Sequence, residues 1–344
     1  MIIVRKHGVV LEPTDRPFEN RSVLNPAIWQ QGKTIHMVYR AINQDFMSAF
    51  GYARLQSPTK IAERLSEPFW RAQAKYEKKG VEDPRLTQIG DKLYMIYVAH
   101  DGKNANLAYA SGPDLWHLER GGLIGARVSY QRAGRMFSKN PKLKDDYLFF
   151  ASFYKEYDSP DVQIWQKDGA LFGEKFRGHF ALVQRILPDI QIVLFKDFAK
   201  LKTAAFWKDY LQRLDKYVML ENKYGFEERH LGGGPPPIKT KDGWLLIYHG
   251  VEEQNKGRIY RAGVALFDLK NPRKLLARLP YPLFEPDRDY ELRGEVDDVV
   301  FPTGTAQLGD HLYIYYGASD RHIAVASVSL KRLLAELSKY RLKK

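Results

Sequence analysis

The residues of this chain best suited to chemistry are two adjacent carboxylates and an arginine around a proline, Glu82-Asp83-Pro84-Arg85. A residue before proline is disfavoured in helical backbone, so Asp83 is expected on a loop or at the start of a strand. Carboxylates held there by rigid strands often serve in acid–base catalysis. A solvated turn with a surface Glu–Arg pair would show the same four residues, so the choice depends on the rest of the chain.

The motif belongs to a unit that recurs five times. Each copy has Pro or Gly, an apolar stretch, a turn, an aromatic-rich strand and a polar residue, and the copies cover 25–40, 83–102, 167–185, 234–250 and 301–320. Each copy predicts a β-hairpin. Further strands are expected at 49–54, 107–110, 260–268 and 323–328. Four-stranded units repeated around an axis form a β-propeller, so the predicted fold is all-β, a five-bladed β-propeller.

The polar residues that end the repeats point to a site. In a propeller, equivalent strands line the central channel, so the repeat ends converge near one mouth. Stability alone gives no reason for polar residues to recur there. These residues are Arg40, Arg185, His249 and Asp320.

Three segments depart from the repeat. Residues 125–165 form an atypical insertion, with a strand expected at 145–154 and loose basic sequence before it. Residues 199–221 are expected to be helical. The predicted catalytic domain covers 1–328. The tail, 329–344, is predicted to be an amphipathic helix that packs on the propeller or on a neighbouring subunit of a homo-oligomer. Its apolar face would contain Leu330, Leu333, Leu334 and Leu337.

Composition narrows the class of protein. Lys and Arg outnumber Asp and Glu by 54 to 41, a net charge of +13, which suits an anionic small substrate as well as general solubility. We find no nucleic-acid-binding motif and no apolar run of about 18 residues, so neither nucleic acid nor a membrane is expected as a partner. Cysteine is absent, and no His/Asp/Glu set has metal-ligand spacing, so no metal is expected. A cytoplasmic location fits these features.

Taken in order, the five motifs resemble glycoside hydrolase family 130, the mannoside phosphorylases and related mannosidases, whose fold is a five-bladed β-propeller. The resemblance is closest over 232–320, good over 81–98, and fair over 20–54 and 167–187. Residues 125–165 do not match the family pattern, and 190–221 match it poorly.

This resemblance implies an inverting β-mannoside phosphorylase that uses inorganic phosphate as co-substrate and needs no cofactor. Asp83 would be the general acid, passing its proton to the glycosidic oxygen through a sugar hydroxyl. A general acid must keep its proton near neutral pH, which burial or the charge of Glu82 would favour and Arg85 would oppose unless it points away. The positions that match the phosphate site are Lys167, Arg185, His249 and Tyr260. Those that match the mannosyl-binding site are Asn25, Arg40 and Asp320.

Two other functions stay open. An inverting mannosidase would need a second carboxylate to activate water, such as Glu227 or Glu295. A carbohydrate-binding propeller without catalysis would bind mannosides and turn none over. The linkage, β-1,4 or β-1,2, and the acceptor sugar also stay open. The run Gly232-Gly233-Gly234 lacks the helix start and Lys-Ser/Thr of a P-loop, so it predicts a close backbone approach beside the channel.

Overall fold

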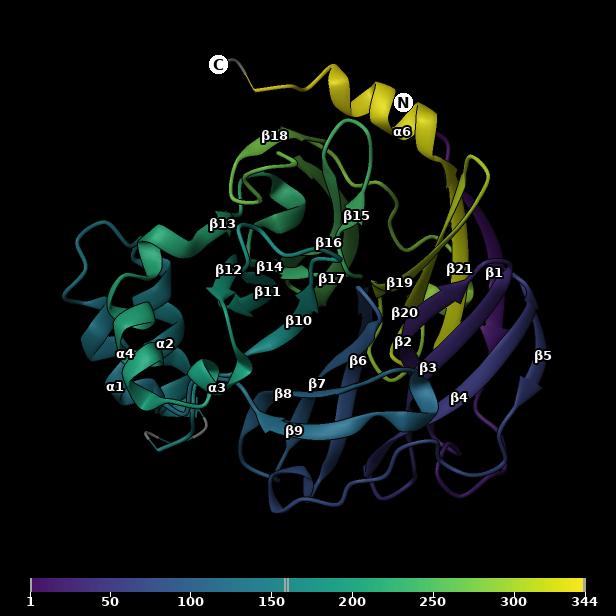
Figure 1. Ribbon diagram of the computed structural model, residues 1–344, viewed down its shortest axis with the longest axis horizontal. Helices are drawn as coiled ribbons and strands as arrows, with labels where there is room; N and C mark the ends of the chain where they lie inside the picture. The colour runs from purple at the N-terminus through teal and green to yellow at the C-terminus, as the bar shows by residue number, and fades with distance from the viewer. Residues whose placement is uncertain (1, 158, 160, 343–344) are drawn as a thin grey trace.

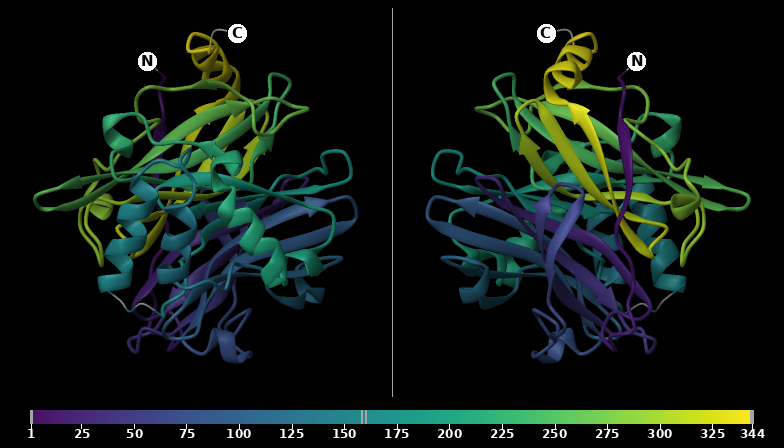
Figure 2. Two further views of the ribbon diagram at one scale, coloured as in Figure 1. Left: turned by 90° about the vertical axis from the view of Figure 1, so that its left-hand side faces the viewer. Right: turned by 90° about the vertical axis from the view of Figure 1, so that its right-hand side faces the viewer.

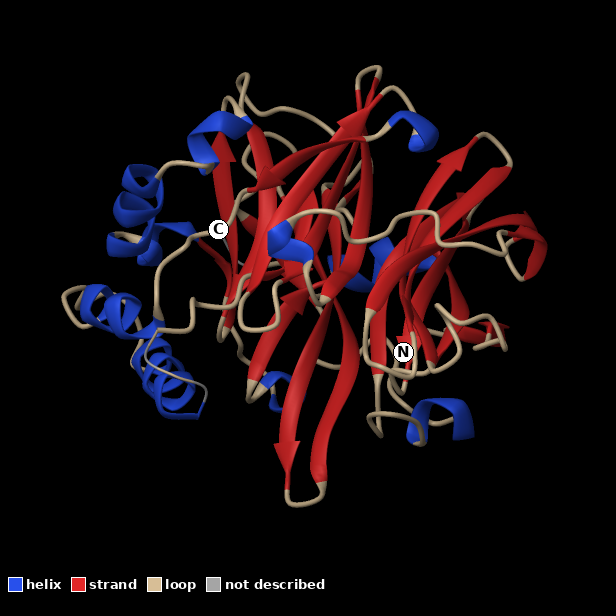
Figure 3. Ribbon diagram, turned by 90° about the horizontal axis from the view of Figure 1, so that it is seen from below, coloured by secondary structure: helices blue, strands red, loops and turns tan. Residues whose placement is uncertain are grey.

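The computed structural model describes residues 2–157, 159 and 161–342, and their fold is mostly β (Figure 1). The strands form antiparallel groups of four or five, in which sequence neighbours pair through short turns. The hairpins predicted from the repeats are present. In Figure 3 strands fill the centre of the molecule and most helices lie outside them.

Two groups share one eight-stranded sheet, joined only by a parallel bridge between Ser48 and Gly80. The first group contains β2 (Ser22–Gln31), β3 (Thr34–Ile42), β4 (Ser48–Ser57) and β5 (Lys60–Arg64). The second contains β6 (Gly80–Ile89), β7 (Lys92–His100), β8 (Ala105–Gly112) and β9 (Glu119–Leu123). We call them the β2–β5 group and the β6–β9 group.

The other groups are separate sheets. The β10–β13 sheet contains β10 (Lys167–Leu171), β11 (Phe180–Ile186), β12 (Asp189–Phe195) and β13 (Val218–Leu220). The β14–β18 sheet contains β14 (His230–Gly233), β15 (Ile238–Lys239), β16 (Trp244–Gln254), β17 (Gly257–Phe267) and β18 (Leu275–Arg278). The last sheet joins β19 (Val300–Leu308), β20 (His311–Ala318) and β21 (His322–Ser329) to the first strand of the chain, β1 (Arg5–Leu11).

The first strands of the groups meet at a common centre (Figure 1). Strand β2 contacts β6, β6 contacts β10, and β10 contacts β14. Strand β19 contacts β16 and β17 on one side and β2 on the other, so the last sheet returns to the first group. Residues far apart in the sequence therefore face one another where these strands converge.

Helices cover one side of this arrangement (Figures 1 and 2). They are α1 (Tyr130–Phe137), α2 (Asp146–Tyr157), α3 (Phe198–Leu201) and α4 (Ala204–Gln212). Helices α1, α2 and α4 share one apolar core with β11 and β12. Short helical turns occur at η1 (Lys75–Glu77), η2 (Leu115–His117), η3 (Leu214–Tyr217), η4 (Gly225–Glu227) and α5 (Asp289–Leu292). Over the described part of the chain, no helix is both long and apolar enough to cross a membrane.

Two predictions for these segments were wrong in part. Residues 145–154 form most of α2 rather than a strand, and the stretch expected to be loose contains α1. Tyr147, Phe150 and Tyr154 follow a helical spacing and are buried, whereas Phe149 is exposed, so the period of burial is that of a helix. Aromatic content suggested a strand, and packing decided otherwise. Helix is confirmed within 199–217, but 218–220 is β13.

The last helix, α6 (Leu330–Ser338), begins at Ser329, whose hydroxyl accepts a hydrogen bond from the backbone N–H of Arg332. Its buried residues Leu333, Leu334 and Leu337 share a core with the strands of the β14–β18 and β19–β1 sheets. Ile2 and Val4 pack against the same core, so both ends of the described chain lie together (Figure 2).

Candidate active site

A cavity of about 170 Å³ lies where the groups converge. That volume is several times the roughly 30 Å³ that one water occupies in the liquid. Its lining residues come from all five groups and from the connecting segments: Asn25, Arg40, Asp83, Lys167, Asp168, Arg185, Tyr260, Val296, Val299, Phe301 and Asp320. The fold thus brings together every predicted site residue except His249.

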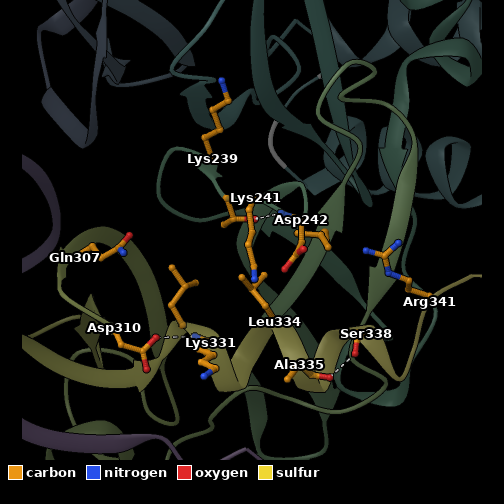
Figure 4. Close-up of a pocket in the computed structure, with 13 residues that line it drawn as sticks. Lys239, Lys241, Asp242, Gln307, Asp310, Lys331, Leu334, Ala335, Ser338 and Arg341 are labelled. Carbon is orange, nitrogen blue, oxygen red and sulfur yellow. Dashed lines mark hydrogen bonds between the residues drawn. The ribbon is translucent and has the colours of Figure 1, made fainter.

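A larger cavity, of about 680 Å³, lies elsewhere, between α6, the β15–β16 turn and the β19–β20 turn (Figure 4). Lys241, Lys331 and Arg341 surround an apolar floor that includes Leu334. It contains none of the predicted site residues. Chemistry rather than size therefore identifies the candidate site.

Three polar side chains reach the smaller cavity from bulged strands. Asn25, Asp83 and Asp168 have left-handed backbone, with φ of 47°, 51° and 58°. Each lies where the pairing register of its strand shifts, in β2, β6 and β10. Bulges re-aim side chains, and left-handed backbone is strained for residues other than glycine. Asp83 therefore lies inside a strand, at a bulge, and not on a loop or at the strand's start.

The carboxyl group of Asp83 is buried, at 7% exposure, and oriented by its neighbours. Asn25 Nδ2 donates a hydrogen bond to Asp83 Oδ1 at 2.8 Å, and Arg40 Nη1 lies 3.5 Å from the same oxygen. Arg85 points away: its Nε donates to the carbonyl of Gly234, and its Nη1 donates to the carbonyls of Asp83 and Pro84. Arg85 thus holds the backbone of the motif and leaves the carboxyl to Asn25 and Arg40.

Glu82 links the two sides of the cavity. Arg40 Nη2 donates to Glu82 Oε1 at 2.8 Å, and Lys167 Nζ donates to Glu82 Oε2 at 3.2 Å. Burial alone would raise the pKa of Glu82, but Arg40 and Lys167 outweigh it and lower the pKa to about 2. Burial also opposes the charge of Lys167, yet Glu82 and Asp83 raise the pKa of Lys167 above its usual value. Glu82 is therefore ionised, and it positions Arg40 on one side of the cavity and Lys167 on the other.

Asp168 was not among the predicted site residues, although it follows Lys167. Its side chain lines the cavity with only 2% exposure, and its Oδ2 lies 3.1 Å from Arg185 Nη1. Burial raises the pKa of Asp168, with Arg185 and Arg85 acting against that rise. Asp168 lies at a bulge equivalent to that of Asp83. This equivalence between the repeats is the signal that could have identified Asp168 as a site residue.

His249 does not line the cavity but lies against two residues that do, Asp168 and Phe301. It is fully buried, its Nε2 is 3.9 Å from Asp168 Oδ2, and its ring centre is 4.2 Å from that of Phe301. Burial, with Arg185 and Arg85, lowers the pKa of His249 well below its ordinary value, so the ring is neutral near pH 7. A β-carbon on Gly232 would come within 2.2 Å of this ring. The predicted close approach of the glycine-rich backbone is confirmed.

Tyr260 and Asp320 complete the lining. Burial raises the pKa of Tyr260, so its hydroxyl stays protonated. Burial also raises the pKa of Asp320 to about 6; Arg40 opposes this shift, and Asp83 adds to it. Asp320 has left-handed backbone, with φ of 50°, at the β20–β21 turn.

The carboxylates suggested as water-activating bases do not line this cavity. Glu227 is fully buried, accepts a hydrogen bond from the Tyr248 hydroxyl at 2.6 Å and pairs with Arg278 at 2.5 Å. Glu295 pairs with Arg21 on the rim.

Glu227 belongs to a set of three residues that recurs in four of the strand groups and that we did not predict. In each set a fully buried glutamate accepts a hydrogen bond from a tyrosine on the second strand of its group and pairs with a cation from the outermost strand. The sets are Glu19–Tyr39–Arg64, Glu77–Tyr97–Arg120, Glu227–Tyr248–Arg278 and Glu291–Tyr316–Lys6. We call these the glutamate triads.

Known proteins that are similar to this chain identify its family. The sequence profile of glycoside hydrolase family 130, described as beta-1,4-mannooligosaccharide phosphorylase, matches residues 4–339. The chain belongs to glycoside hydrolase family 130. The family assignment extends over 125–165 and 190–221, where the sequence alone showed little resemblance.

Relatives within family 130 cover nearly the whole chain. The beta-1,2-mannobiose phosphorylase of Thermoanaerobacter sp. (strain X514) is 32% identical over 338 residues, which are 94% of this chain and 96% of the relative. The 1,2-beta-oligomannan phosphorylase of the same strain is 29% identical over 333 residues, covering 94% and 95%. The solved structure of a beta-1,2-mannobiose phosphorylase from Listeria innocua has a TM-score of 0.73 at 22% identity and covers 98% of this chain and 99% of that chain, which shows the same fold.

Over the described residues, no three His, Cys, Asp or Glu side chains lie close enough together to hold a metal ion.

Proposed function

We propose that this chain is an inverting β-mannoside phosphorylase, which converts a β-mannoside and phosphate reversibly into α-mannose 1-phosphate and a shortened acceptor. The observation that carries the proposal is one cavity that places a carboxyl group, Asp83, together with two cations, Lys167 and Arg185. The relatives named as phosphorylases support it.

In this mechanism Asp83 is the general acid. Its proton passes through a sugar hydroxyl to the glycosidic oxygen as the bond from that oxygen to the anomeric carbon breaks. Asn25 holds the carboxyl group through Oδ1. Arg40 and Asp320 bind mannosyl hydroxyls, since both line the cavity beside Asp83.

Phosphate is the nucleophile. One of its oxygens forms the new bond to the anomeric carbon from the face opposite the leaving group, which inverts the configuration. The proton lost by hydrogen phosphate balances the proton that the acceptor gains. Lys167 and Arg185 hold the anion, one as a compact charge and the other as a planar donor fork. Tyr260 adds a hydroxyl donor, and His249 supports the phosphate side from below as a neutral ring.

The same proposal includes the architecture. The five strand groups are the blades of a single-domain β-propeller over 1–328, and α6 packs on its rim. The return of β19 to β2 supports a closed ring. The substrate is proposed to be a β-1,2-linked mannoside, because both relatives that match over 94% of this chain carry that linkage in their names.

The test is synthesis in reverse. Purified protein is incubated with α-mannose 1-phosphate and a panel of acceptor sugars, and released phosphate is measured. We expect release with mannose as acceptor and a β-1,2-linked product. Cleavage of β-1,2-mannobiose that proceeds equally well without phosphate would instead identify a mannosidase, and binding without turnover would identify a carbohydrate-binding protein.

A further inference from the structure

The cavity is nearly neutral before any anion enters. In and next to the cavity lie four cationic side chains, Arg40, Arg85, Lys167 and Arg185, and four carboxyl side chains, Glu82, Asp83, Asp168 and Asp320, of which Asp83 carries the proton of the proposed general acid. The cations proposed to bind phosphate are already paired, Lys167 with Glu82 at 3.2 Å and Arg185 with Asp168 at 3.1 Å. A phosphate dianion would therefore add two negative charges to a site whose phosphate-binding cations are already paired.

Asp168 is the carboxylate that an anion at Arg185 would meet. Its side chain is almost fully buried, yet neither of its oxygens accepts a hydrogen bond from any described residue. The contact with Arg185 is an ion pair without hydrogen-bond geometry. Buried polar groups are normally hydrogen-bonded, so this carboxylate lacks a donor on the cavity side.

We propose that Asp168 accepts a hydrogen bond from a protonated oxygen of phosphate, so that the cavity selects oxyanions that carry a proton and rejects sulfate. This inference rests on the proposed function, and it adds that the anion used in that function must carry a proton. Phosphate and arsenate near neutral pH carry both a proton and charged oxygens. The charged oxygens would bind Lys167 and Arg185, and the protonated oxygen would donate its hydrogen bond to Asp168.

Sulfate lacks the proton. It has four acceptor oxygens and no donor, so one oxygen would face the Asp168 carboxylate across a buried contact. Two like charges that are buried together without a hydrogen-bond donor between them repel strongly, so this contact would disfavour the binding of sulfate. A site built around a hydrogen bond discriminates against a ligand that cannot make it far better than an apolar pocket discriminates by size.

The titratable groups that face Asp168 make its carboxylate the acceptor of this hydrogen bond. Arg85 and Asp83 face it from β6, Lys167 from β10, Arg185 from β11 and His249 from β16. The raised pKa of Lys167 keeps that side chain charged, and the low pKa of His249 keeps that ring neutral. Burial raises the pKa of Asp168, which agrees with a proton shared between its carboxylate and phosphate.

Hydrogen phosphate carries the proton that Asp168 would accept. Above the second ionisation of phosphoric acid the free anion is HPO₄²⁻, which keeps this proton until the third ionisation, far above neutral pH. Its binding should therefore neither take up nor release a proton in that range, and its affinity should change little with pH. Asp320 also titrates near neutral pH, so any slope that remains is read as the difference between the wild type and a variant of Asp168.

The experiment is calorimetric titration of the wild type and Asp168→Asn with phosphate, arsenate and sulfate, one pH unit below and one above neutrality. The wild type should bind phosphate and arsenate and bind sulfate at least about 100-fold more weakly. In Asp168→Asn an amide donor replaces the carboxylate, so sulfate should bind within about tenfold of phosphate. Asp91→Asn, an exposed aspartate in the β6–β7 turn, is the matched control.

Wild-type protein alone provides a second test if Asp168→Asn does not fold. Titration in two buffers with different ionisation enthalpies measures the protons exchanged on binding, and we expect close to none per phosphate above neutral pH, because HPO₄²⁻ brings the shared proton with it. Release of about one proton per phosphate above neutral pH, wild-type binding of sulfate as tight as of phosphate, or unchanged rejection of sulfate by Asp168→Asn would each overturn this inference alone. Absence of phosphate binding, with cleavage that ignores phosphate, would overturn the proposed function with it.

Discussion

The β10–β13 sheet and the β14–β18 sheet are neighbours that are held together in different ways. In the β14–β18 sheet, Tyr248 on the second strand donates to buried Glu227, which pairs with Arg278. The equivalent residue of the β10–β13 sheet is Gln184, which accepts from Gln166 and donates to the hydroxyl of Tyr210 on helix α4. The β14–β18 sheet is thus braced by residues of β16 and β18 together with the turn η4, and the β10–β13 sheet is braced from outside by helix α4.

The difference separates the two sides of the active site. Asn25, Asp83 and Asp320 lie on groups with a glutamate triad. On the phosphate side, the cations Lys167 and Arg185 and their neighbour Asp168 lie on the sheet without one, while Tyr260 and His249 lie on the β14–β18 sheet, which has one. The acid and sugar side should therefore be insensitive to the helical insertion, and the two phosphate-binding cations should depend on it.

The largest expected effect is on catalysis by the braced side. Asp83→Asn should lower kcat by about 10²–10⁴-fold, because the proton donor is lost. Its midpoint of thermal unfolding should stay near the wild-type value, since the β6–β9 group keeps its triad. Steady-state kinetics and a thermal melt of Asp83→Asn, with Asp91→Asn as control, measure both. Wild-type kcat in Asp83→Asn would remove this residue as the acid.

Breaking a triad should affect stability and spare the chemistry. Glu227→Gln leaves Arg278 buried without its carboxylate, which should cost about 3–5 kcal/mol in the free energy of unfolding. Below its melting range the variant should turn over normally. Glu228→Gln, an exposed neighbour, is the control in denaturant titrations. A large loss of kcat with unchanged stability would instead support Glu227 as a water-activating base.

The pH dependence of stability should reveal Asp320. The pKa of its carboxyl rises from 3.8 to about 6 on folding, so the folded state holds this proton more tightly than the unfolded state. The resulting stabilisation is complete below about pH 4 and is lost as pH rises through 6. It amounts to at most about 3 kcal/mol. Thermal melts of wild type and Asp320→Asn across this range should diverge, and parallel curves would contradict the shift.

The smallest effect should come from the outside brace of the β10–β13 sheet. Tyr210→Phe removes the hydroxyl that Gln184 and the carbonyl of Ile192 share, at a cost of about 1–2 kcal/mol. We expect the KM for phosphate to rise while the KM for mannoside stays constant. Tyr315→Phe, which removes a hydroxyl bonded to the carbonyl of Pro58, should lose similar stability without a phosphate effect. Equal changes in both KM values would end the separation of the two sides.

Sequence reasoning reached the hairpins because each is local, with its alternation and its turn inside about 20 residues. It also collected seven of the lining residues, because repeat ends and family motifs fall at equivalent strand positions. It mistook α2 for a strand, since aromatic content outweighed a helical spacing that burial makes plain. It predicted that His249 lines the site, because it did not take into account the alternation of side chains along β16, which turns this ring away from the cavity.

Other signals were present and went unused. Each triad glutamate precedes its tyrosine by 20, 20, 21 or 25 residues. Asn25 and Asp83 precede proline and Asp168 precedes glycine, which marks the three bulges. The pairing of Arg185 with Asp168 could not be predicted, because it depends on the pairing register of β10 and β11, two strands of a diverged repeat.

The pairing of β1 with β21 has a consequence for biosynthesis. Lys6 and its partner Glu291 are separated by 285 residues, and the last sheet is complete only when both ends of the chain are present. At 5–20 residues per second, the first strand leaves the ribosome about 15–60 s before its partner exists. Its apolar face must wait exposed or be shielded by a chaperone during that interval. Supplying a synthetic peptide of residues 2–12 to ribosome-released protein that lacks this segment should therefore restore folding in trans.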